Sequence, residues 1–312
     1  MTEILAIGTY PDWDEKGFAD LGARRLDTIE ALDTLSEGER AAIRAVGYKG
    51  HHAFSGAKMD MLPNLGLIAN FGVGYDAIDV DAATERGIKV TNTPDVLNDD
   101  VADLAVAMLI NVSRNMRMGE DWVRSGTWAE KGDMPLNRKV SGGKCGILGL
   151  GRIGRDIADR MAAFKMEMHY YARSEKNTPS GWTYHADPVD LARAVDYIVI
   201  ALVGGPETAK FVSAEMIAAL GDDGILVNIS RGSVVDEGAL LEALENGRLR
   251  GAGLDVFVGE PRIDPRFHRL ENVVLQPHQG SGTVETRKAM GELQRDNVTA
   301  FLNGAALKSP VK

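Results

Sequence analysis

The chain has 312 residues, 44% hydrophobic and 26% charged, and a formal net charge of −10. These values are ordinary for a globular protein of up to two domains, and the negative charge argues against nucleic acid or an anionic membrane as the main partner. The single cysteine, Cys145, excludes an intrachain disulfide. We interpret it as a small core residue and expect a reducing, cytoplasmic location.

Residues 1–95 are expected to form a first α/β unit. Short apolar runs predict strands over 4–7, 46–48, 65–70 and 88–91, and helical patterns predict helices over 17–25 and 77–85. The N-terminus runs directly into the first strand without a basic leader, so no secretory signal is expected.

A long helix is expected after residue 98, with Asn98 as its N-cap and acidic residues at 99 and 100 in its first turn. It is apolar almost all round from 101 to 112, which predicts burial on every face at a subunit interface or domain junction. The run 101–110 contains Asp103 and is too short to span a bilayer. Residues 119–140 show few helix or strand signals and are expected to form an extended arm.

From 144 to 277 short apolar runs alternate with helical patterns, which favours a parallel sheet covered on both faces. The expected strands are 145–149, 167–171, 196–201, 224–229, 252–256 and 272–275. An amphipathic helix over 284–302 is expected to close the chain and to pack near the first unit.

A glycine fingerprint follows the strand at 145–149. Gly149, Gly151 and Gly154 form G-x-G-x-x-G, with Leu150, Arg152 and Ile153 between them as further expected cofactor contacts, and a helix is expected over 152–164. The glycines allow a tight turn and close approach of backbone to a pyrophosphate, which the helix N-terminus attracts. The alternative is an ordinary turn, but a position between strand and helix favours a dinucleotide site.

The next strand leads to the residues expected to select the cofactor. Ala172 stands where an NAD-binding site usually carries an acid, and Arg173 and Ser174 follow, with Lys176 close by. A missing carboxylate beside a guanidinium suits a 2′-phosphate. The alternative is a solvated loop arginine; we favour NADPH, with NADH a weaker cofactor.

Three ionisable side chains follow later strands and should meet at one edge of the sheet. Arg231 follows strand 224–229, Glu260 lies just beyond strand 252–256, and His278 follows strand 272–275. Arg231 can hold the carboxylate of a 2-oxo acid, His278 can protonate the developing alkoxide, and Glu260 can keep the imidazole charged and oriented. Backbone N–H groups of the segment 71–75 could bind the substrate carboxylate from the other domain.

With these motifs in this order, the sequence resembles the D-isomer-specific 2-hydroxyacid dehydrogenases over nearly its whole length. The motifs are Gly72–Asp76, Asn92–Asp95, Gly149–Gly154, Pro206–Thr208, Asn228–Gly232, Gly253–Phe257 with Glu260 and Pro261, and Pro277–His278. The resemblance implies two domains with parallel sheets: a flavodoxin-like substrate domain (1–98 and 286–312) and a Rossmann-like dinucleotide domain (99–285). In the latter, 99–140 would be the dimerisation helix and arm.

The resemblance also assigns residue roles. Arg231, Glu260 and His278 would be catalytic, Val73 and Gly74 would hold the substrate carboxylate, and Asp255 would bond the nicotinamide amide. Further expected cofactor contacts are Pro206, Thr208, Ile229, Ser230 and Gly280, together with Arg231 and His278. No metal site is expected.

Within that family the sequence looks most like the NADPH-preferring glyoxylate/hydroxypyruvate reductases and the related hydroxyphenylpyruvate reductases. This implies a homodimer whose arm tryptophan, here Trp128, reaches the partner's site. The segment 51–56 should line the substrate pocket, where Phe54 and the histidines His51 and His52 add bulk. The loop Val203–Gly205 departs from the proline-containing loop usual in the family, and Gln279 is polar where relatives are usually apolar.

Other functions stay open at this point. A dinucleotide-sensing transcriptional corepressor keeps the same fold and catalytic residues, but its extra terminal segments are not evident here. Formate oxidation is less favoured because Glu260 and His278 are both present, and a phosphoglycerate dehydrogenase with a C-terminal regulatory domain is disfavoured because no such segment follows.

Overall fold

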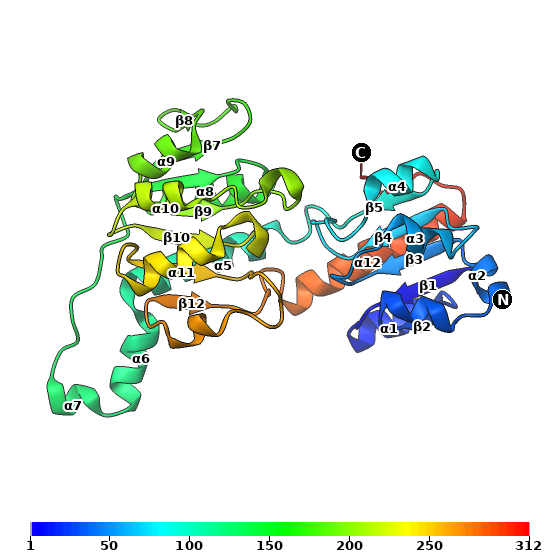
Figure 1. The fold of residues 1–312 in the computed structure, drawn as a ribbon, viewed down its shortest axis with the longest axis horizontal. Helices are drawn as coiled ribbons and strands as arrows, with labels where there is room; N and C mark the ends of the chain where they lie inside the picture. Colours follow the sequence, from blue (N-terminus) through cyan, green and yellow to red (C-terminus); the bar gives the residue numbers. More distant parts are fainter. Residues whose placement is uncertain (1, 312) are drawn as a thin grey trace. The chain divides into compact units, whose positions relative to one another are not determined.

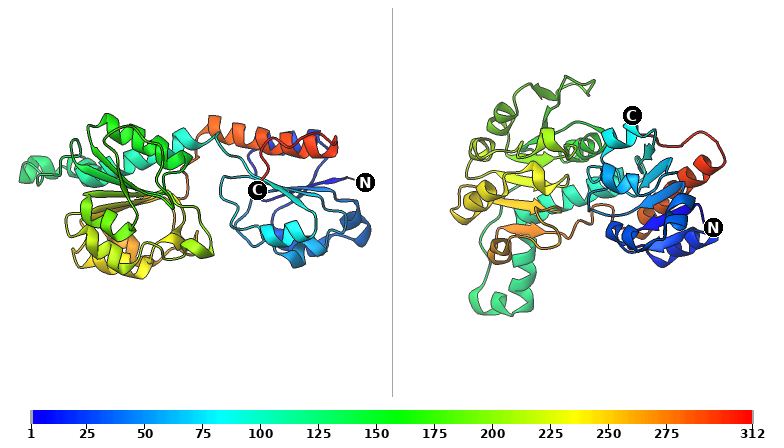
Figure 2. Two further views of the ribbon diagram at one scale, coloured as in Figure 1. Left: turned by 90° about the horizontal axis from the view of Figure 1, so that it is seen from above. Right: turned by 45° about the vertical axis from the view of Figure 1, so that its right-hand side comes forward.

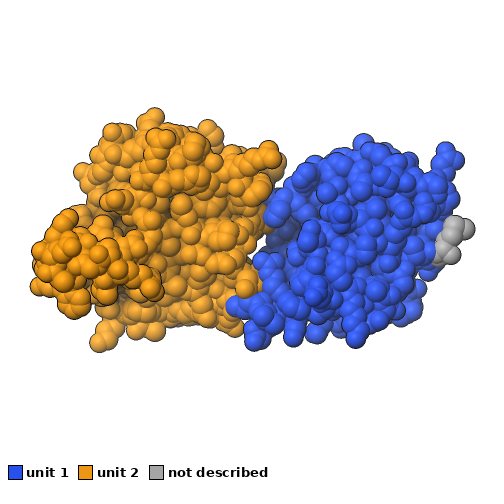
Figure 3. All heavy atoms as spheres, turned by 90° about the horizontal axis from the view of Figure 1, so that it is seen from below, with its two compact units in different colours: residues 1–97, 283–312 blue, residues 98–282 orange. Residues whose placement is uncertain are grey.

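The computed structural model describes residues 2–311, which divide into two compact units (Figures 1 and 3). One unit runs to Leu97 and resumes at Thr283, and the other spans Asn98–Gly282. The domain boundaries expected from the sequence, 98/99 and 285/286, lie one and three residues further along the chain. No helix of residues 2–311 is both long and apolar enough to cross a membrane.

The first unit holds a five-stranded parallel sheet in the order β2-β1-β3-β4-β5, the order of flavodoxin-like folds. Its strands are β1 (Ile4–Ile7), β2 (Arg24–Leu26), β3 (Ala45–Tyr48), β4 (Leu67–Asn70) and β5 (Lys89–Thr91). Its helices are α1 (Asp12–Asp20), α2 (Glu37–Ala42), α3 (Gly56–Asp60), α4 (Val80–Glu85) and α12 (Val284–Leu302). Helix α12 runs along one face of this sheet and α4 lies on the other (Figure 2, left).

The second unit holds a seven-stranded parallel sheet in the order β12-β11-β10-β9-β6-β7-β8, a Rossmann order with one added strand. Its strands are β6 (Lys144–Leu148), β7 (Glu167–Tyr171), β8 (Thr183–His185), β9 (Tyr197–Ile200), β10 (Ile225–Asn228), β11 (Gly251–Leu254) and β12 (Val273–Leu275). Its helices are α5 (Asn98–Arg114), α6 (Met116–Arg124), α7 (Thr127–Lys131), α8 (Arg152–Ala163), α9 (Pro188–Ala194), α10 (Ala214–Leu220) and α11 (Glu237–Glu245). The expected α/β class with two parallel sheets is confirmed.

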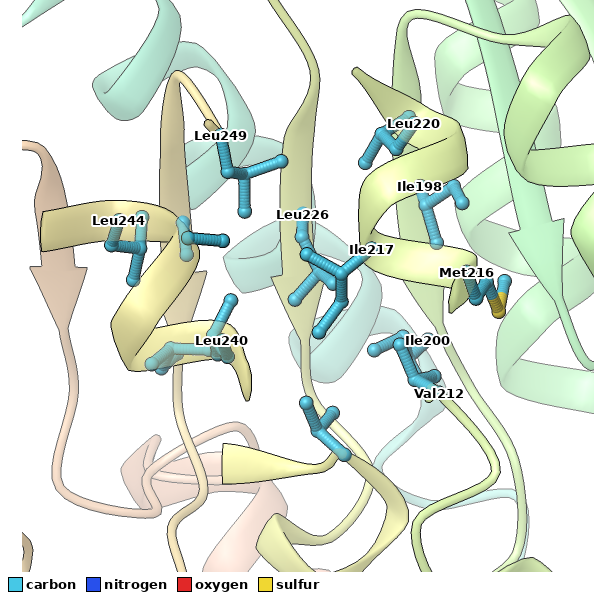
Figure 4. Close-up of a cluster of buried hydrophobic side chains, with 14 of the residues drawn as sticks. Ile198, Ile200, Val212, Met216, Ile217, Leu220, Leu226, Leu240, Leu244 and Leu249 are labelled. Atoms are coloured by element: carbon cyan, nitrogen blue, oxygen red, sulfur yellow. The ribbon is translucent and has the colours of Figure 1, made fainter. Parts of the chain in front are cut away.

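The strands form where the sequence is continuously apolar, because both faces of each sheet are covered. All four residues of β9, Tyr-Ile-Val-Ile, are buried. Side chains from β9 and β10 interdigitate with those of α10 and α11 in the core shown in Figure 4, whose labelled members include Ile198, Leu226, Ile217 and Leu244. Each such aliphatic side chain contributes about 1.5–3 kcal/mol by leaving water. This core fixes the strand ends at which the polar residues follow.

Strands β2 and β8 and helices α2 and α3 were not expected, and one expected helix ends early. Helix α1 ends at Asp20, before most of the predicted 17–25, and β2 takes up part of that range. Arg25 of β2 donates hydrogen bonds to the carbonyl oxygens of Ala6 (2.8 Å) and Gly8 (2.6 Å) and pairs with Glu15, so this edge strand is held by polar groups. The other missed strand, β8, is also a three-residue edge strand, and such strands carry no apolar run.

The region from 98 to 140 needs the larger corrections. Asn98 is the first residue of α5 and not a cap before it. The buried residues of α5 lie along one face, while Ala107 on the opposite side is exposed, so in this chain the helix is not buried all round. The expected extended arm begins with two helices, α6 and α7, and it lacks regular structure at the turn 125–126 and over residues 132–143.

Candidate functional site

The turn between β6 and α8 has the geometry that a dinucleotide phosphate requires. Gly149 has φ +101°, a conformation that favours glycine, and a Cβ at Gly154 would lie 2.0 Å from the carbonyl oxygen of Gly149. Gly151 is the N-cap of α8 and caps it with no side chain, and a Cβ there would meet nothing within 4 Å. The helix N-terminus is therefore open to an anion, and the residues present fit a dinucleotide.

The loop that follows β7 presents cationic and hydroxyl groups where an acid would exclude a 2′-phosphate. Ala172 is buried, and its carbonyl oxygen accepts a hydrogen bond from the Tyr184 hydroxyl (3.3 Å). Arg173 and Ser174 are exposed, and Nζ of Lys176 lies 3.4 Å from Oγ of Ser174. An exposed guanidinium, ammonium and hydroxyl suit a phosphate monoester.

Arg231 is fixed at the end of β10 by its own loop. The Asn228 side chain accepts hydrogen bonds from the backbone N–H (3.0 Å) and hydroxyl (3.1 Å) of Ser230, and donates one to the carbonyl oxygen of Arg231 (3.0 Å). Nη1 of Arg231 donates to the carbonyl oxygen of Ser230 (2.8 Å). A Cβ at Gly204 would lie 2.6 Å from Cγ of Arg231, so the departure at 203–205 makes room for this arginine.

A carboxylate–imidazole pair lies on the same sheet edge. Nδ1 of His278 is 2.7 Å from Oε2 of Glu260, and the other oxygen of Glu260 accepts the backbone N–H of Phe257 (2.7 Å). The carboxylate can only accept, so we assign the proton to Nδ1 of His278. His278 has φ +52°, and its backbone N–H donates to the carbonyl oxygen of Asp255 (2.8 Å).

Asp255 holds the loop that carries His278. Its two carboxylate oxygens accept the backbone N–H groups of Gln279 and Gly280, each at 2.8 Å. Burial raises the pKa of the Asp255 carboxyl above its ordinary value, and the two N–H groups partly offset this. Asp255 therefore fixes the backbone around His278; its expected contact with a nicotinamide amide stays a prediction.

The remaining expected cofactor residues lie at the same edge of the second unit's sheet. Pro206 and Thr208 form a 3₁₀ turn after β9, Ile229 and Ser230 follow β10, and Gly280 follows β12. The hydroxyl of Thr208 donates to the carbonyl oxygen of Val203 (2.7 Å). The carboxyl ends of parallel strands are where ligands bind in such sheets.

Comparison with known proteins places this geometry in a family. Residues 106–280 match the family model "D-isomer specific 2-hydroxyacid dehydrogenase, NAD binding domain". The chain belongs to that family. It is 46% identical to hydroxyphenylpyruvate reductase of Plectranthus scutellarioides over 86% of both chains. Its identity to glyoxylate/hydroxypyruvate reductase A of Arabidopsis thaliana is 44%, over 92% of this chain and 91% of the relative.

A solved structure agrees with the dehydrogenase over its full length. The NADPH-dependent glyoxylate/hydroxypyruvate reductase of Sinorhizobium meliloti, in complex with NADP and malonate, has a TM-score of 0.92 and 37% identity. The match covers 100% of this chain and 97% of that one.

In the first unit of this dehydrogenase, the loop after β4 turns its carbonyl groups inward. Nδ2 of Asn70 donates to the carbonyl oxygens of Gly72 (3.2 Å) and Gly74 (2.9 Å), and Nδ2 of Asn92 donates to that of Val73 (2.9 Å). These contacts engage the carbonyl oxygens of the loop and not the backbone N–H groups of Val73 and Gly74. N–H groups are the donors that a carboxylate needs, so the loop suits the carboxylate binding expected of these two residues.

Phe54 is a correction to the expected substrate pocket. Its side chain is fully buried in the core of the first unit, with its ring edge-on to Tyr48 at 5.4 Å. The segment 51–56 has no regular spacing of apolar residues that would predict this aromatic side chain to point inward. His51 and His52 are exposed, and their role in the pocket stays a prediction.

Trp128 belongs to an apolar groove on the arm of the dehydrogenase. The groove has a volume of about 670 Å³ and lies between the end of α5, helices α6 and α7, and the segment 133–139. Trp128 is 57% exposed there and Leu136 is 98% exposed. Apolar side chains gathered on such a surface are typical of an interface.

Two residues that support the site were not predicted. Asn228 holds the backbone of Arg231 and Gly204 leaves room for its side chain, but nothing in the sequence beyond their place near strand ends indicates these roles. Cys145 is confirmed as a core residue: it is fully buried, and burial raises the pKa of its thiol to about 12.

Proposed function

We propose that this dehydrogenase is an NADPH-dependent reductase of short 2-oxo acids, with glyoxylate and hydroxypyruvate as the expected substrates. The observation that carries the proposal is the 2.7 Å contact between His278 and Glu260 at the sheet edge that also holds the glycine fingerprint. The names of the relatives in Arabidopsis and Sinorhizobium support the substrate class.

The proposed roles follow from chemistry. When bound, the reduced nicotinamide supplies the hydride. The imidazolium of His278 faces Glu260 with its Nδ1–H, so Nε2 carries the proton delivered to the developing alkoxide. Arg231 pairs with the substrate carboxylate and polarises the adjacent carbonyl. The backbone N–H groups of Val73 and Gly74 keep the carboxylate-binding role proposed for them.

The proposed cofactor preference rests on the loop after β7. Ala172 offers no carboxylate to repel a 2′-phosphate, and Arg173 and Ser174 are exposed beside it. The Sinorhizobium structure contains NADP, which supports this choice. We expect NADPH to be preferred to NADH, and Arg173→Ala to lose much of that preference.

We also propose a homodimer joined through α5 and the groove on the arm. Trp122, Trp128 and Leu136 supply the apolar surface that a second copy would cover. The proposed cytoplasmic location rests on the single cysteine, which allows no intrachain disulfide.

The test is a panel of glyoxylate, hydroxypyruvate and hydroxyphenylpyruvate, each with NADPH and with NADH. We expect the largest kcat/KM with NADPH and the two short acids. A larger kcat/KM with hydroxyphenylpyruvate would favour the activity named for the Plectranthus relative instead. No turnover with any 2-oxo acid would contradict the proposal and favour the dinucleotide-sensing corepressor.

A further inference from the structure

Arg155, in the first turns of α8, is fixed by three groups that have no part in the proposed reaction. Its Nε lies 3.0 Å from a carboxylate oxygen of Asp159 on the same helix. Its Nη1 donates to the carbonyl oxygen of Asn177 (3.3 Å), and its guanidinium carbon lies 4.9 Å from the ring centroid of Trp182. A guanidinium over an indole is a favourable cation–π pair.

Asn177 and Trp182 belong to the loop that connects β7 to β8, visible beside those strands in Figure 1. The beginning of this loop holds Arg173, Ser174 and Lys176, the groups expected at the 2′-phosphate. Arg155 therefore ties this loop to the helix whose N-terminus is expected to hold the pyrophosphate.

The inner part of the loop is held by two tyrosines. The Tyr170 hydroxyl accepts the backbone N–H of Lys176 (3.0 Å) and donates to its carbonyl oxygen (3.2 Å). The Tyr184 hydroxyl donates to the carbonyl oxygen of Ala172 (3.3 Å), and the two rings lie 5.5 Å apart. These contacts shape the loop but do not connect it to α8, and Arg155 makes that connection.

We propose that Arg155 is a positioning residue for 2′-phosphate recognition. Through its stack on Trp182 and its hydrogen bond to Asn177, it holds Arg173, Ser174 and Lys176 at a set distance from the N-terminus of α8. The inference rests on the proposed use of NADPH and extends it to a residue outside the phosphate-binding groups.

The charge of Arg155 is already paired with that of Asp159. We therefore expect Arg155 to position the loop rather than to bind the 2′-phosphate directly. The two carboxylate oxygens of Asp159 lie 3.0 and 3.1 Å from Nε of Arg155. The Asn177 carbonyl oxygen accepts a hydrogen bond from Nη1 of Arg155, and the guanidinium lies over the Trp182 ring. A loop held in place before the ligand arrives loses less entropy on binding. Its release should weaken the contacts made only by the 2′-phosphate and leave those of the adenosine and pyrophosphate.

The experiment measures binding of 2′,5′-ADP and of 5′-AMP by calorimetry, so that no turnover is needed. The variants are Trp182→Leu, which removes the stack at a distance from the phosphate groups, and Arg155→Lys, which keeps the charge but loses the planar stack and fork. We expect each to weaken 2′,5′-ADP about three- to tenfold, with 5′-AMP changed by less than about twofold.

Two controls accompany these variants. Arg193→Ala removes an exposed arginine of α9 that pairs with Asp190 on the same helix, and it should change the affinity for neither ligand. Arg173→Ala removes a proposed direct contact and should show how large a loss of phosphate binding the assay reports. Limited trypsin digestion after Arg173 and Lys176 should be faster in Trp182→Leu than in wild type.

Each outcome decides one point. If the variants lose affinity for 2′,5′-ADP and 5′-AMP equally, Arg155 supports the whole nucleotide site. If Trp182→Leu keeps its affinity for 2′,5′-ADP, the stack on Trp182 does not hold the loop. Either result overturns the inference and leaves the proposed use of NADPH intact. Equal affinity of wild type for the two ligands would overturn both the inference and the proposed cofactor preference.

Discussion

At the residue scale, the site consists of charged groups whose neighbours hold them in one orientation. Glu260 uses one oxygen for the backbone N–H of Phe257 and the other for His278. The positions of Arg231, Glu260 and His278 were predictable, because each residue follows a buried strand and the carboxyl ends of parallel strands lie at one edge of the sheet. Asn228 and Gly204 were not, since their roles depend on hydrogen bonds and clearances that only the folded loops create.

Glu260 should matter for the rate of reduction because it orients the proposed proton donor. Its Oε2 lies 2.7 Å from Nδ1 of His278, and Glu260→Gln replaces this charged acceptor with a neutral amide that holds the imidazole less firmly. We expect kcat for a 2-oxo acid to fall by about a hundredfold, the lower end of what a positioned acid contributes, with KM changed little. Glu237→Gln is the matched control, because Glu237 accepts the neighbouring N–H of Val258 (2.9 Å). A wild-type kcat in Glu260→Gln would show that Glu260 does not support the donor.

At the element scale, the apolar core strands and the long helix α12 were predictable from continuous or periodic apolar residues. The edge strands β2 and β8 and the helices α6 and α7 were not. An edge strand forms backbone hydrogen bonds with only one neighbouring strand, and its polar side chains interrupt the apolar pattern that identifies strands. Helices α6 and α7 span only nine and five residues, which is shorter than the stretch over which a repeated apolar pattern identifies a helix.

The edge strand β8 is joined to β7 by a histidine pair that should make stability depend on pH. Nδ1 of His169 lies 3.0 Å from Nε2 of His185, and the other nitrogen of His169 is 3.0 Å from Glu167. Burial, followed by the neighbouring His169, lowers the pKa of His185, while Asp190 of α9 opposes this. The unfolded chain then binds the proton more readily than the folded one, so acidification through about pH 6.5 costs stability.

We therefore expect the midpoint of thermal unfolding to fall from about pH 7.5 to about pH 5.5, and to fall less in His185→Asn. The exposed His268 provides the control, since His268→Asn should keep the wild-type dependence. A His185→Asn curve that parallels wild type would show that this pair does not couple protonation to folding.

At the scale of the whole molecule, the two units each have a complete parallel sheet and their own core. The groove on the arm is an additional apolar surface whose lining residues belong to neither core. The fold class and the order of motifs were predictable over the whole length. The burial of Phe54 was not, because the segment 51–56 lacks the regular spacing that assigns a side chain to a face.

Leu136, the most exposed large apolar side chain of the arm, should be buried by a second copy in the proposed homodimer. Leu136→Asp introduces a charge that would then have to be desolvated, so it should shift the protein from dimer to monomer in sedimentation velocity. Val203→Asp, at a 69% exposed position of the same unit, should leave the dimer intact. A monomeric wild-type protein, or an unchanged dimer in Leu136→Asp, would contradict the proposed interface.

We propose that His278, held by Glu260, delivers the proton during reduction of a 2-oxo acid. The measurement that tests it most directly is the single-turnover rate of NADPH oxidation by His278→Gln, taken together with the affinity of that variant for NADPH. Loss of a positioned acid slows a proton-transfer step by roughly a hundred- to ten-thousand-fold. We expect a loss of that order with NADPH affinity nearly unchanged. A near-normal rate in His278→Gln would contradict this role of His278.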